Sequence, residues 1–135
     1  ARKTIEHGME GKVTAVHCIS LAAHPRKYRE EVYALCKKAD MHVISCPTAW
    51  IDHNRTERMA VSHNSITPVD EMVPAGLNVA FGTDNICDIY KPFSDGDLWT
   101  EMRVMLEACH YYDIDNLAKI ATTNGLKVLG IEPKA

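Results

Sequence analysis

The chain has 135 residues, a formal net charge of −3, 46% hydrophobic residues and 24% charged residues. This length allows one domain with its own core, and the charge argues against a nucleic-acid or anionic-membrane surface. No apolar run approaches the roughly 20 residues of a membrane span. The five cysteines are an odd number without CxxC spacing, which favours buried, reduced thiols and predicts a cytoplasmic protein.

The first quarter of the chain alternates between helix and strand patterns. Residues 1–8 are expected to end a helix, with Gly8 as its stop. The β-rich run 12–18 predicts a buried strand that ends at His17. Pro25 suits the first position of a second helix, because its fixed φ is compatible with a helical start.

The middle of the chain repeats this alternation around a long loop. Residues 42–46 predict a second strand, and residues 47–66 form a long polar loop, which in compact domains is usually functional or mobile. Thr67 is expected to cap a short helix. A third strand, 77–85, then ends in the polar pair that contains Asp84. A buried strand that ends in a carboxylate needs a partner for that charge.

The last third predicts helices. Asp97 begins a helix whose apolar residues have helical spacing, a pattern typical of a core face. These residues are Leu98, Met102, Met105, Cys109 and Tyr112. A further helix is expected over 115–122, and 126–131 closes the pattern. Strands that alternate with helices indicate βαβ units, so we predict an α/β fold with a parallel sheet.

The three predicted strands place polar residues at their carboxyl ends, which lie on one rim of a parallel sheet. His17 and Asp84 could therefore reach the same small volume. A carboxylate and an imidazole at such a rim suit a metal site or a proton-transfer pair. The alternative is that His17 is a satisfied core histidine and Asp84 a cap or turn residue. The sequence contains no HExxH, HxH, GxGxxG, P-loop or GxSxG motif.

Three segments together resemble a known family. Residues 8–17 (GMEGKVTAVH) resemble the sixth-strand segment of bacterial cytosine deaminases. Residues 82–88 (GTDNICD), followed by Pro92 and Phe93, resemble their eighth-strand segment, and are also similar to isopropylammelide amidohydrolases. Residues 122–130 (TTNGLKVLG) resemble the closing segment of amidohydrolases generally. The chain thus resembles the amidohydrolase superfamily over nearly its whole length, in its cytosine deaminase and isopropylammelide branch.

The resemblance implies a fold and an activity. Residues 1–135 would form the C-terminal part of a TIM (β/α)8 barrel, comprising strands six to eight with their helices. The complete protein would be a metal-dependent hydrolase of C–N bonds in a cyclic amidine or aminated heterocycle, releasing ammonia or an amine. Its partners would be a small heterocyclic substrate and either a second copy of the chain, as in a homo-oligomer, or the missing part of the barrel.

The resemblance also implies roles for individual residues. Asp84 would bind a divalent metal, Zn²⁺ or Fe²⁺, and shuttle a proton from the attacking water. His17 would orient the attacking hydroxide or the substrate. Asn85, Asp88 and Tyr90 would contact the substrate, with Tyr90 as an aromatic lining of the pocket. Most metal ligands would lie outside this chain. Residues 50–53 would lie near the mouth of the pocket.

The sequence departs from the family pattern in two ways. Thr83 and Asn85 stand where cytosine deaminases usually carry His and Asp, and the Asn is more like the isopropylammelide group. The strand-one HxH and the strand-five His and Glu are absent, and a catalytic zinc normally needs more ligands than remain. We therefore expect the chain alone to be inactive, with unpaired sheet edges. Two alternatives are a non-catalytic small α/β binding module and a degenerate homologue that serves only in assembly.

Overall fold

The structure, a computed structural model, describes residues 1–52 and 66–132. Its centre is a parallel three-stranded sheet whose spatial order follows the chain. The strands are β1 (Thr14–Val16), β2 (His42–Ser45) and β3 (Asn78–Phe81). Within the described ranges β1 and β3 each pair with β2 alone, so each keeps one edge without a strand partner. The expected α/β fold with parallel strands is confirmed.

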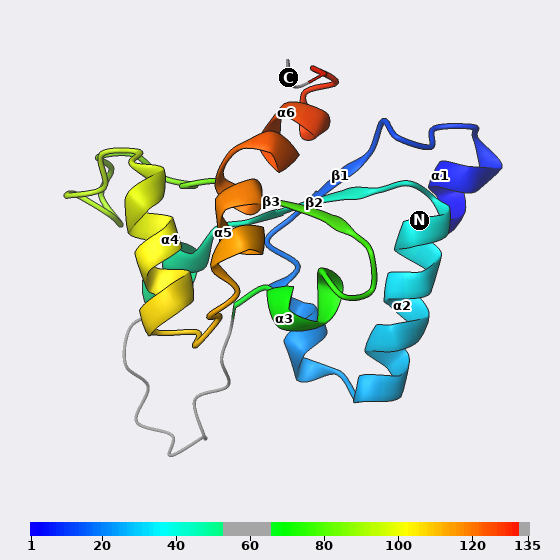
Figure 1. The fold of residues 1–135 in the computed structure, drawn as a ribbon, viewed down its shortest axis with the longest axis horizontal. Helices are drawn as coiled ribbons and strands as arrows, with labels where there is room; N and C mark the ends of the chain where they lie inside the picture. Colours follow the sequence, from blue (N-terminus) through cyan, green and yellow to red (C-terminus); the bar gives the residue numbers. More distant parts are fainter. Residues whose placement is uncertain (53–65, 133–135) are drawn as a thin grey trace.

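Helices connect the strands and follow the last one (Figure 1). The α-helices are α1 (Arg2–Glu6), α2 (Arg26–Lys38), α3 (Val69–Met72), α4 (Leu98–Glu107), α5 (Ile114–Ala121) and α6 (Thr123–Val128). Two 3-10 helices, η1 (Ile19–Ala23) and η2 (Pro47–Asp52), follow β1 and β2. Parallel strands need long crossovers, and the crossovers here contain α2 and α3. None of the helices in the two described ranges has the length and apolarity to cross a bilayer.

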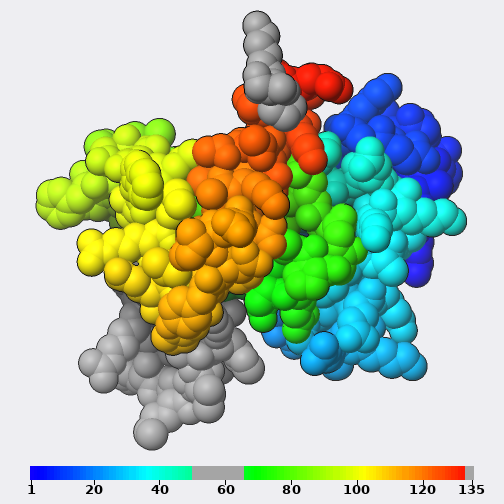
Figure 2. All heavy atoms as spheres, in the orientation of Figure 1, coloured from blue at the N-terminus to red at the C-terminus, as the bar shows by residue number. Residues whose placement is uncertain are grey.

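The core lies on one face of the sheet. Val43, Val79 and Phe81 are buried there, because alternate residues of neighbouring strands point to the same face. Side chains from four helices cover them, and Figure 2 shows α4, α5, α3 and α2 packed side by side on this face. These side chains are Tyr33, Met72, Met105, Leu117 and Ile120. The opposite face is more open, and Val16 on β1 remains 51% exposed.

Most expected boundaries are confirmed within one or two residues, but two expectations are wrong: the third strand ends at Phe81 and not at residue 85, and the cap of α3 is not the expected residue. Pro68, not Thr67, directly precedes α3. The Thr67 hydroxyl instead donates a hydrogen bond to the backbone carbonyl of His17. The hydroxyl is therefore used to join the end of β1 to the start of α3. At α4 the expected start is confirmed, because Asp97 accepts a hydrogen bond from the backbone N–H of Trp99 at 2.9 Å.

The apolar stripe of α4 is confirmed except at its end. Leu98, Met102, Met105 and Cys109 contact the core. Tyr112, which we expected to continue the stripe, is 67% exposed, and Tyr111 packs on the core instead. The reason is that α4 ends at Glu107, so helical spacing no longer decides which face a later residue occupies.

Candidate active site

His17 is held at the end of β1 by its backbone. Its N–H donates to the carbonyl of Ile44 at 2.8 Å, and its own carbonyl accepts the Thr67 hydroxyl. His17 has a φ of 65°, a left-handed conformation that non-glycine residues rarely adopt without compensating contacts. This conformation ends the strand and places the imidazole at the rim, where its side chain is 35% exposed.

Asp84 lies three residues after the end of β3. It also has a left-handed backbone, with a φ of 60°. Its Oδ1 lies 3.8 Å from Nε2 of His17, although 67 positions separate the two residues in the chain. This distance exceeds a direct hydrogen bond and suits two side chains that share a third group. Nδ1 of His17 is buried and has no hydrogen-bond partner within the described residues.

A lysine that no sequence pattern singled out lies beside this pair. The side chain of Lys91 is 8% exposed, and its ammonium lies 3.6 Å from Oδ2 of Asp84. The ammonium also donates to the Thr83 carbonyl at 3.2 Å and lies 3.5 Å from the Thr48 hydroxyl. We name His17, Asp84 and Lys91 the rim cluster, since they meet where the strands end.

Glu101 of α4 contacts the rim through Thr48, which follows β2. It is 1% exposed, and its carboxylate accepts the backbone N–H of Thr48 at 2.9 Å and the Thr48 hydroxyl at 2.6 Å. Burial raises the pKa of Glu101, while the Thr48 hydrogen bonds and the Lys91 charge oppose that change. The sequence did contain an indication of this residue, because Glu101 falls within the apolar stripe of α4, where a charge needs a partner.

Cys46, directly after β2, and Gly82, directly after β3, also lie at the rim. Cys46 is 6% exposed, and burial, together with the nearby Asp84 charge, raises its pKa to about 11. A pKa raised in this way favours the protonated thiol at neutral pH. Gly82 packs tightly, because a Cβ at this position would lie 2.8 Å from Ile44 Cγ2 and 3.3 Å from Cys46 Sγ.

The loop after Asp84 holds the three residues expected to contact a substrate. The Asn85 side-chain amide donates to the Asp88 carboxylate, which also accepts the N–H groups of Tyr90 at 2.9 Å and Lys91 at 2.8 Å. These hydrogen bonds hold the pKa of Asp88 below its usual value, with the Lys91 N–H as the largest cause. Asp88 thus organises the loop that carries Lys91. Tyr90 is 71% exposed.

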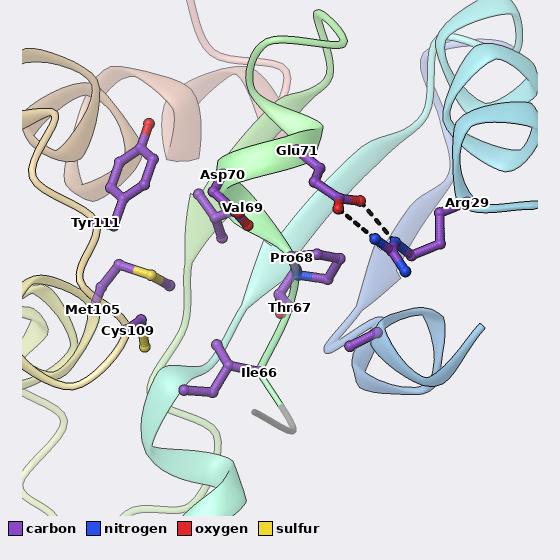
Figure 3. Close-up of a pocket in the computed structure, with 11 residues that line it drawn as sticks. Arg29, Ile66, Thr67, Pro68, Val69, Asp70, Glu71, Met105, Cys109 and Tyr111 are labelled. Carbon is purple, nitrogen blue, oxygen red and sulfur yellow. Dashed lines mark hydrogen bonds and ion pairs between the residues drawn. The ribbon is translucent and has the colours of Figure 1, made fainter. Parts of the chain in front are cut away.

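A separate cavity of about 230 Å³ lies between α3, α4 and the start of α2 (Figure 3). On one side Arg29 forms a two-pronged ion pair with Glu71, at 2.5 and 2.8 Å, and the Tyr33 hydroxyl donates to Glu71 at 2.9 Å. On the other side Cys109 is protonated at neutral pH, because burial raises its pKa to about 11. We name Arg29, Tyr33 and Glu71 the α2–α3 cluster. Its charges satisfy one another, which leaves this cavity less suited to chemistry than the rim.

The rim offers part of a metal-binding set. A carboxylate and an imidazole are donors that Zn²⁺ and Fe²⁺ accept, and Asp84 and His17 present them at a half-exposed position. Within the described ranges no group of three or more His, Cys, Asp or Glu side chains is arranged to hold a metal ion. The donor types of Asp84 and His17 therefore fit a divalent metal, of which they would supply at most two ligands. Residues 53–65, with the expected pocket-mouth residue His53, lie outside the described residues.

Comparisons with known proteins identify the class. The model of the Amidohydrolase family matches residues 1–135, so the chain belongs to this family. It is 31% identical over 135 residues to the N-isopropylammelide isopropyl amidohydrolase of Pseudomonas sp. (strain ADP), covering 98% of this chain and 30% of that protein. It is 26% identical over 132 residues to the pterin deaminase of Rhizobium rhizogenes (strain K84 / ATCC BAA-868), covering 96% and 30%.

A solved structure gives the same result in three dimensions. The 5-methylcytosine deaminase from Klebsiella pneumoniae, liganded with 5-fluorocytosine, superposes with a TM-score of 0.83 at 28% identity. The match covers 96% of this chain and 32% of that chain. This chain therefore spans less than a third of the length of each of these three relatives, and the expected resemblance to the deaminase and isopropylammelide branch is confirmed.

Proposed function

We propose that residues 1–135 form strands six to eight and the trailing helices of a (β/α)8 barrel, in a metal-dependent hydrolase of C–N bonds. The substrate class is a cyclic amidine or aminated heterocycle, from which water displaces ammonia or an amine. The family match over the whole chain supports the hydrolase class. The names of the relatives, an isopropyl amidohydrolase, a pterin deaminase and a 5-methylcytosine deaminase, support the substrate class.

The single observation that carries the proposal is the approach of Asp84 to His17. The two residues follow different strands, both have left-handed backbones, and their side chains lie 3.8 Å apart at the same rim. Active sites of parallel barrels lie at the carboxyl ends of their strands. Backbone strain of this kind is retained where surrounding structure compensates for it, often at functional positions.

Each residue has a defined chemical task in this proposal. Asp84 supplies a carboxylate to a divalent metal, takes a proton from the attacking water and delivers it to the leaving nitrogen. His17 orients the attacking water or the substrate with Nε2. When bound, Zn²⁺ or Fe²⁺ lowers the pKa of water to about 7 and polarises the carbon–nitrogen bond. Most of the remaining ligands come from outside this chain, so the chain alone is inactive.

In this proposal the loop after β3 supplies the residues that contact the substrate. Asn85 and Tyr90 face the heterocycle in this proposal, and Asp88 acts indirectly, because its carboxylate already binds Asn85 and the N–H groups of Tyr90 and Lys91. The exposed Tyr90 ring would be covered by the substrate or by the rest of the barrel. A cytoplasmic location and homo-oligomerisation stay predictions.

The test uses the complete reading frame that contains this chain. We expect upstream strands carrying HxH and a further His, and release of ammonia or amine from cytosine, 5-methylcytosine, pterin or an alkylamino triazine. Asp84→Asn should lower kcat by about a thousandfold and remove bound metal, while the unfolding midpoint stays near that of the wild type. Asp115→Asn, an exposed aspartate in the first turn of α5, is the matched control and should change neither activity nor metal content.

Two results would contradict the proposal. A reading frame without upstream strands would favour the alternative of a non-catalytic α/β binding module. Full activity and full metal content in Asp84→Asn would remove Asp84 from the site. The cavity in Figure 3 does not favour the binding-module alternative by itself, since the charges of the α2–α3 cluster are already paired.

A further inference from the structure

Lys91 is a buried charged side chain of the rim cluster, at 8% exposure. Burying an ammonium costs free energy unless hydrogen bonds and an opposite charge compensate for it. Lys91 has three acceptors around it, at 3.2 Å (Thr83 carbonyl), 3.5 Å (Thr48 hydroxyl) and 3.6 Å (Asp84 Oδ2). An ammonium has three N–H donors; the Thr83 carbonyl and the Thr48 hydroxyl each accept one of them, and Asp84 Oδ2 forms an ion pair with the ammonium. The contacts of the Lys91 ammonium are thus with groups of the protein itself, which is the arrangement of a side chain that holds other side chains in place.

The hydrogen bonds of Thr48 define how Lys91 is held. The Thr48 hydroxyl has one proton, and it donates that proton to Glu101 at 2.6 Å. The hydroxyl oxygen therefore has only lone pairs to offer Lys91, which donates to it. Glu101 also accepts the Thr48 backbone N–H at 2.9 Å. A chain of contacts runs from α4 through the end of β2 to the loop after β3.

The last group in this series of contacts is the carboxylate of Asp84. Its two oxygens face different partners: Oδ2 faces Lys91 at 3.6 Å, and Oδ1 faces His17 at 3.8 Å. A carboxylate whose second oxygen is held by a fixed charge keeps its orientation when the first oxygen binds a ligand.

We propose that Lys91 is a positioning residue for Asp84: supported by Thr48 and Glu101, its ammonium fixes Oδ2 and thereby keeps Oδ1 directed toward His17. This inference rests on the proposed function, in which Asp84 contributes to a metal site. Lys91 acts through Asp84 and touches neither substrate nor metal. If Lys91 did not position Asp84, its positive charge would only repel the metal, and removing that charge would strengthen metal binding. If Lys91 does position Asp84, removing it should weaken metal binding.

The experiment measures Zn²⁺ affinity and steady-state kinetics of the complete protein. Lys91→Met removes the charge and keeps most of the side-chain length. We expect Zn²⁺ affinity, measured by competition with a chromophoric chelator, to fall by about tenfold or more. We expect kcat to fall while KM changes by less than about threefold. Lys127→Met, at an exposed lysine of α6, should leave both quantities unchanged.

A second variant covers the case in which Lys91→Met yields too little folded protein. Lys91→Gln keeps N–H donors for Thr48 and Thr83 without the charge, and should weaken Zn²⁺ binding to a similar extent. Zn²⁺ affinity that is unchanged or tighter in a folded Lys91 variant would overturn this inference and leave the proposed function standing. A wild-type protein without Asp84-dependent Zn²⁺ binding would overturn both.

Discussion

The rim cluster and the α2–α3 cluster each join a carboxylate to a cation and to a ring-bearing side chain, but they differ in how closely the partners meet. In the α2–α3 cluster, Glu71 accepts three hydrogen bonds of 2.5 to 2.9 Å. In the rim cluster, Asp84 lies 3.6 Å from Lys91 and 3.8 Å from His17. Both carboxylates are partly exposed, at 23% for Glu71 and 33% for Asp84.

This difference separates a cluster that joins secondary-structure elements from one suited to binding. The α2–α3 cluster connects two crossover helices with fully paired atoms, so its contribution is to stability. The rim cluster combines longer contacts, two left-handed residues and a buried Nδ1 of His17 with no partner in the described ranges. Groups arranged in this way cost stability unless a further group completes them. Substitutions in the first cluster should therefore affect folding, and substitutions in the second should affect activity.

Glu71→Gln should give the largest loss of stability of any substitution in either cluster. The amide removes the charge that pairs with Arg29 and one acceptor of the Arg29 and Tyr33 donors, and leaves a partly buried guanidinium without its counter-charge. We expect the thermal unfolding midpoint to fall by several degrees, and kcat/KM at a permissive temperature to stay within about threefold. Loss of activity in the folded Glu71→Gln protein would contradict the division between the clusters.

Gly82→Ala should come next, because it disturbs the backbone that leads from β3 to Asp84. The added Cβ would meet Ile44 Cγ2 at 2.8 Å, closer than packed atoms approach. Overpacking of this kind costs about 1–3 kcal/mol, measurable by chemical denaturation. Since the clash lies between β2 and the rim, we expect activity to fall as well. Gly125→Ala is the control, because a Cβ there would have no atom within 4 Å.

The sequence predicted the α/β class, the parallel strands and the position of the rim. Continuous apolar runs separated by helix patterns marked all three strands, and the rule that parallel strands end at one rim predicted that His17 and Asp84 would lie close together. The structure places their side chains 3.8 Å apart. Asp97 and the stripe of α4 followed from local rules that depend on few tertiary contacts.

The supporting residues were not predictable in the same way. Lys91 lies in a loop of mixed composition, and only the three-dimensional path of that loop buries its ammonium against Thr48 and Asp84. Thr67 had the pattern of a helix cap, but its hydroxyl donates a hydrogen bond to the distant backbone carbonyl of His17. Some side chains can form a hydrogen bond either with the local backbone or with a distant group. Tertiary contacts decide which partner they take, and a sequence pattern does not contain those contacts.

The pH dependence of stability should distinguish two carboxylates, the partly buried Glu71 and the buried Glu101. Hydrogen bonds from Arg29 lower the pKa of Glu71, so its stabilising effect is present above its ordinary value of 4.5 and is lost as the pH falls through the lowered pKa. Burial raises the pKa of Glu101, so stability falls as the pH rises above 4.5 through the raised pKa. Each slope is at most about 1.4 kcal/mol per pH unit.

Denaturation curves from pH 3 to 8 for the wild type, Glu71→Gln and Glu101→Gln check these signs. The advantage of the wild type over Glu71→Gln should shrink as the pH falls below about 4.5. The free energy of unfolding of the wild type, relative to that of Glu101→Gln, should fall as the pH rises above about 4.5. Parallel curves for all three proteins would show that neither carboxylate has a pKa in the folded state that differs from its unfolded value.

Tyr33→Phe is the smallest change and the sharpest test of how the α2–α3 cluster is held together. Tyr33 is 3% exposed, and its hydroxyl donates to Glu71 at 2.9 Å, so the substitution removes one hydrogen bond with little change in packing. We expect a loss of about 1 kcal/mol in the free energy of unfolding. In Glu71→Gln the same substitution should cost less, because the acceptor is already altered, which gives a measurable coupling energy. Combined with Lys91→Met at the rim, the effect of Tyr33→Phe should add without coupling. Equal costs in all three backgrounds would show that the hydroxyl contributes through packing alone and that Glu71 is held by Arg29.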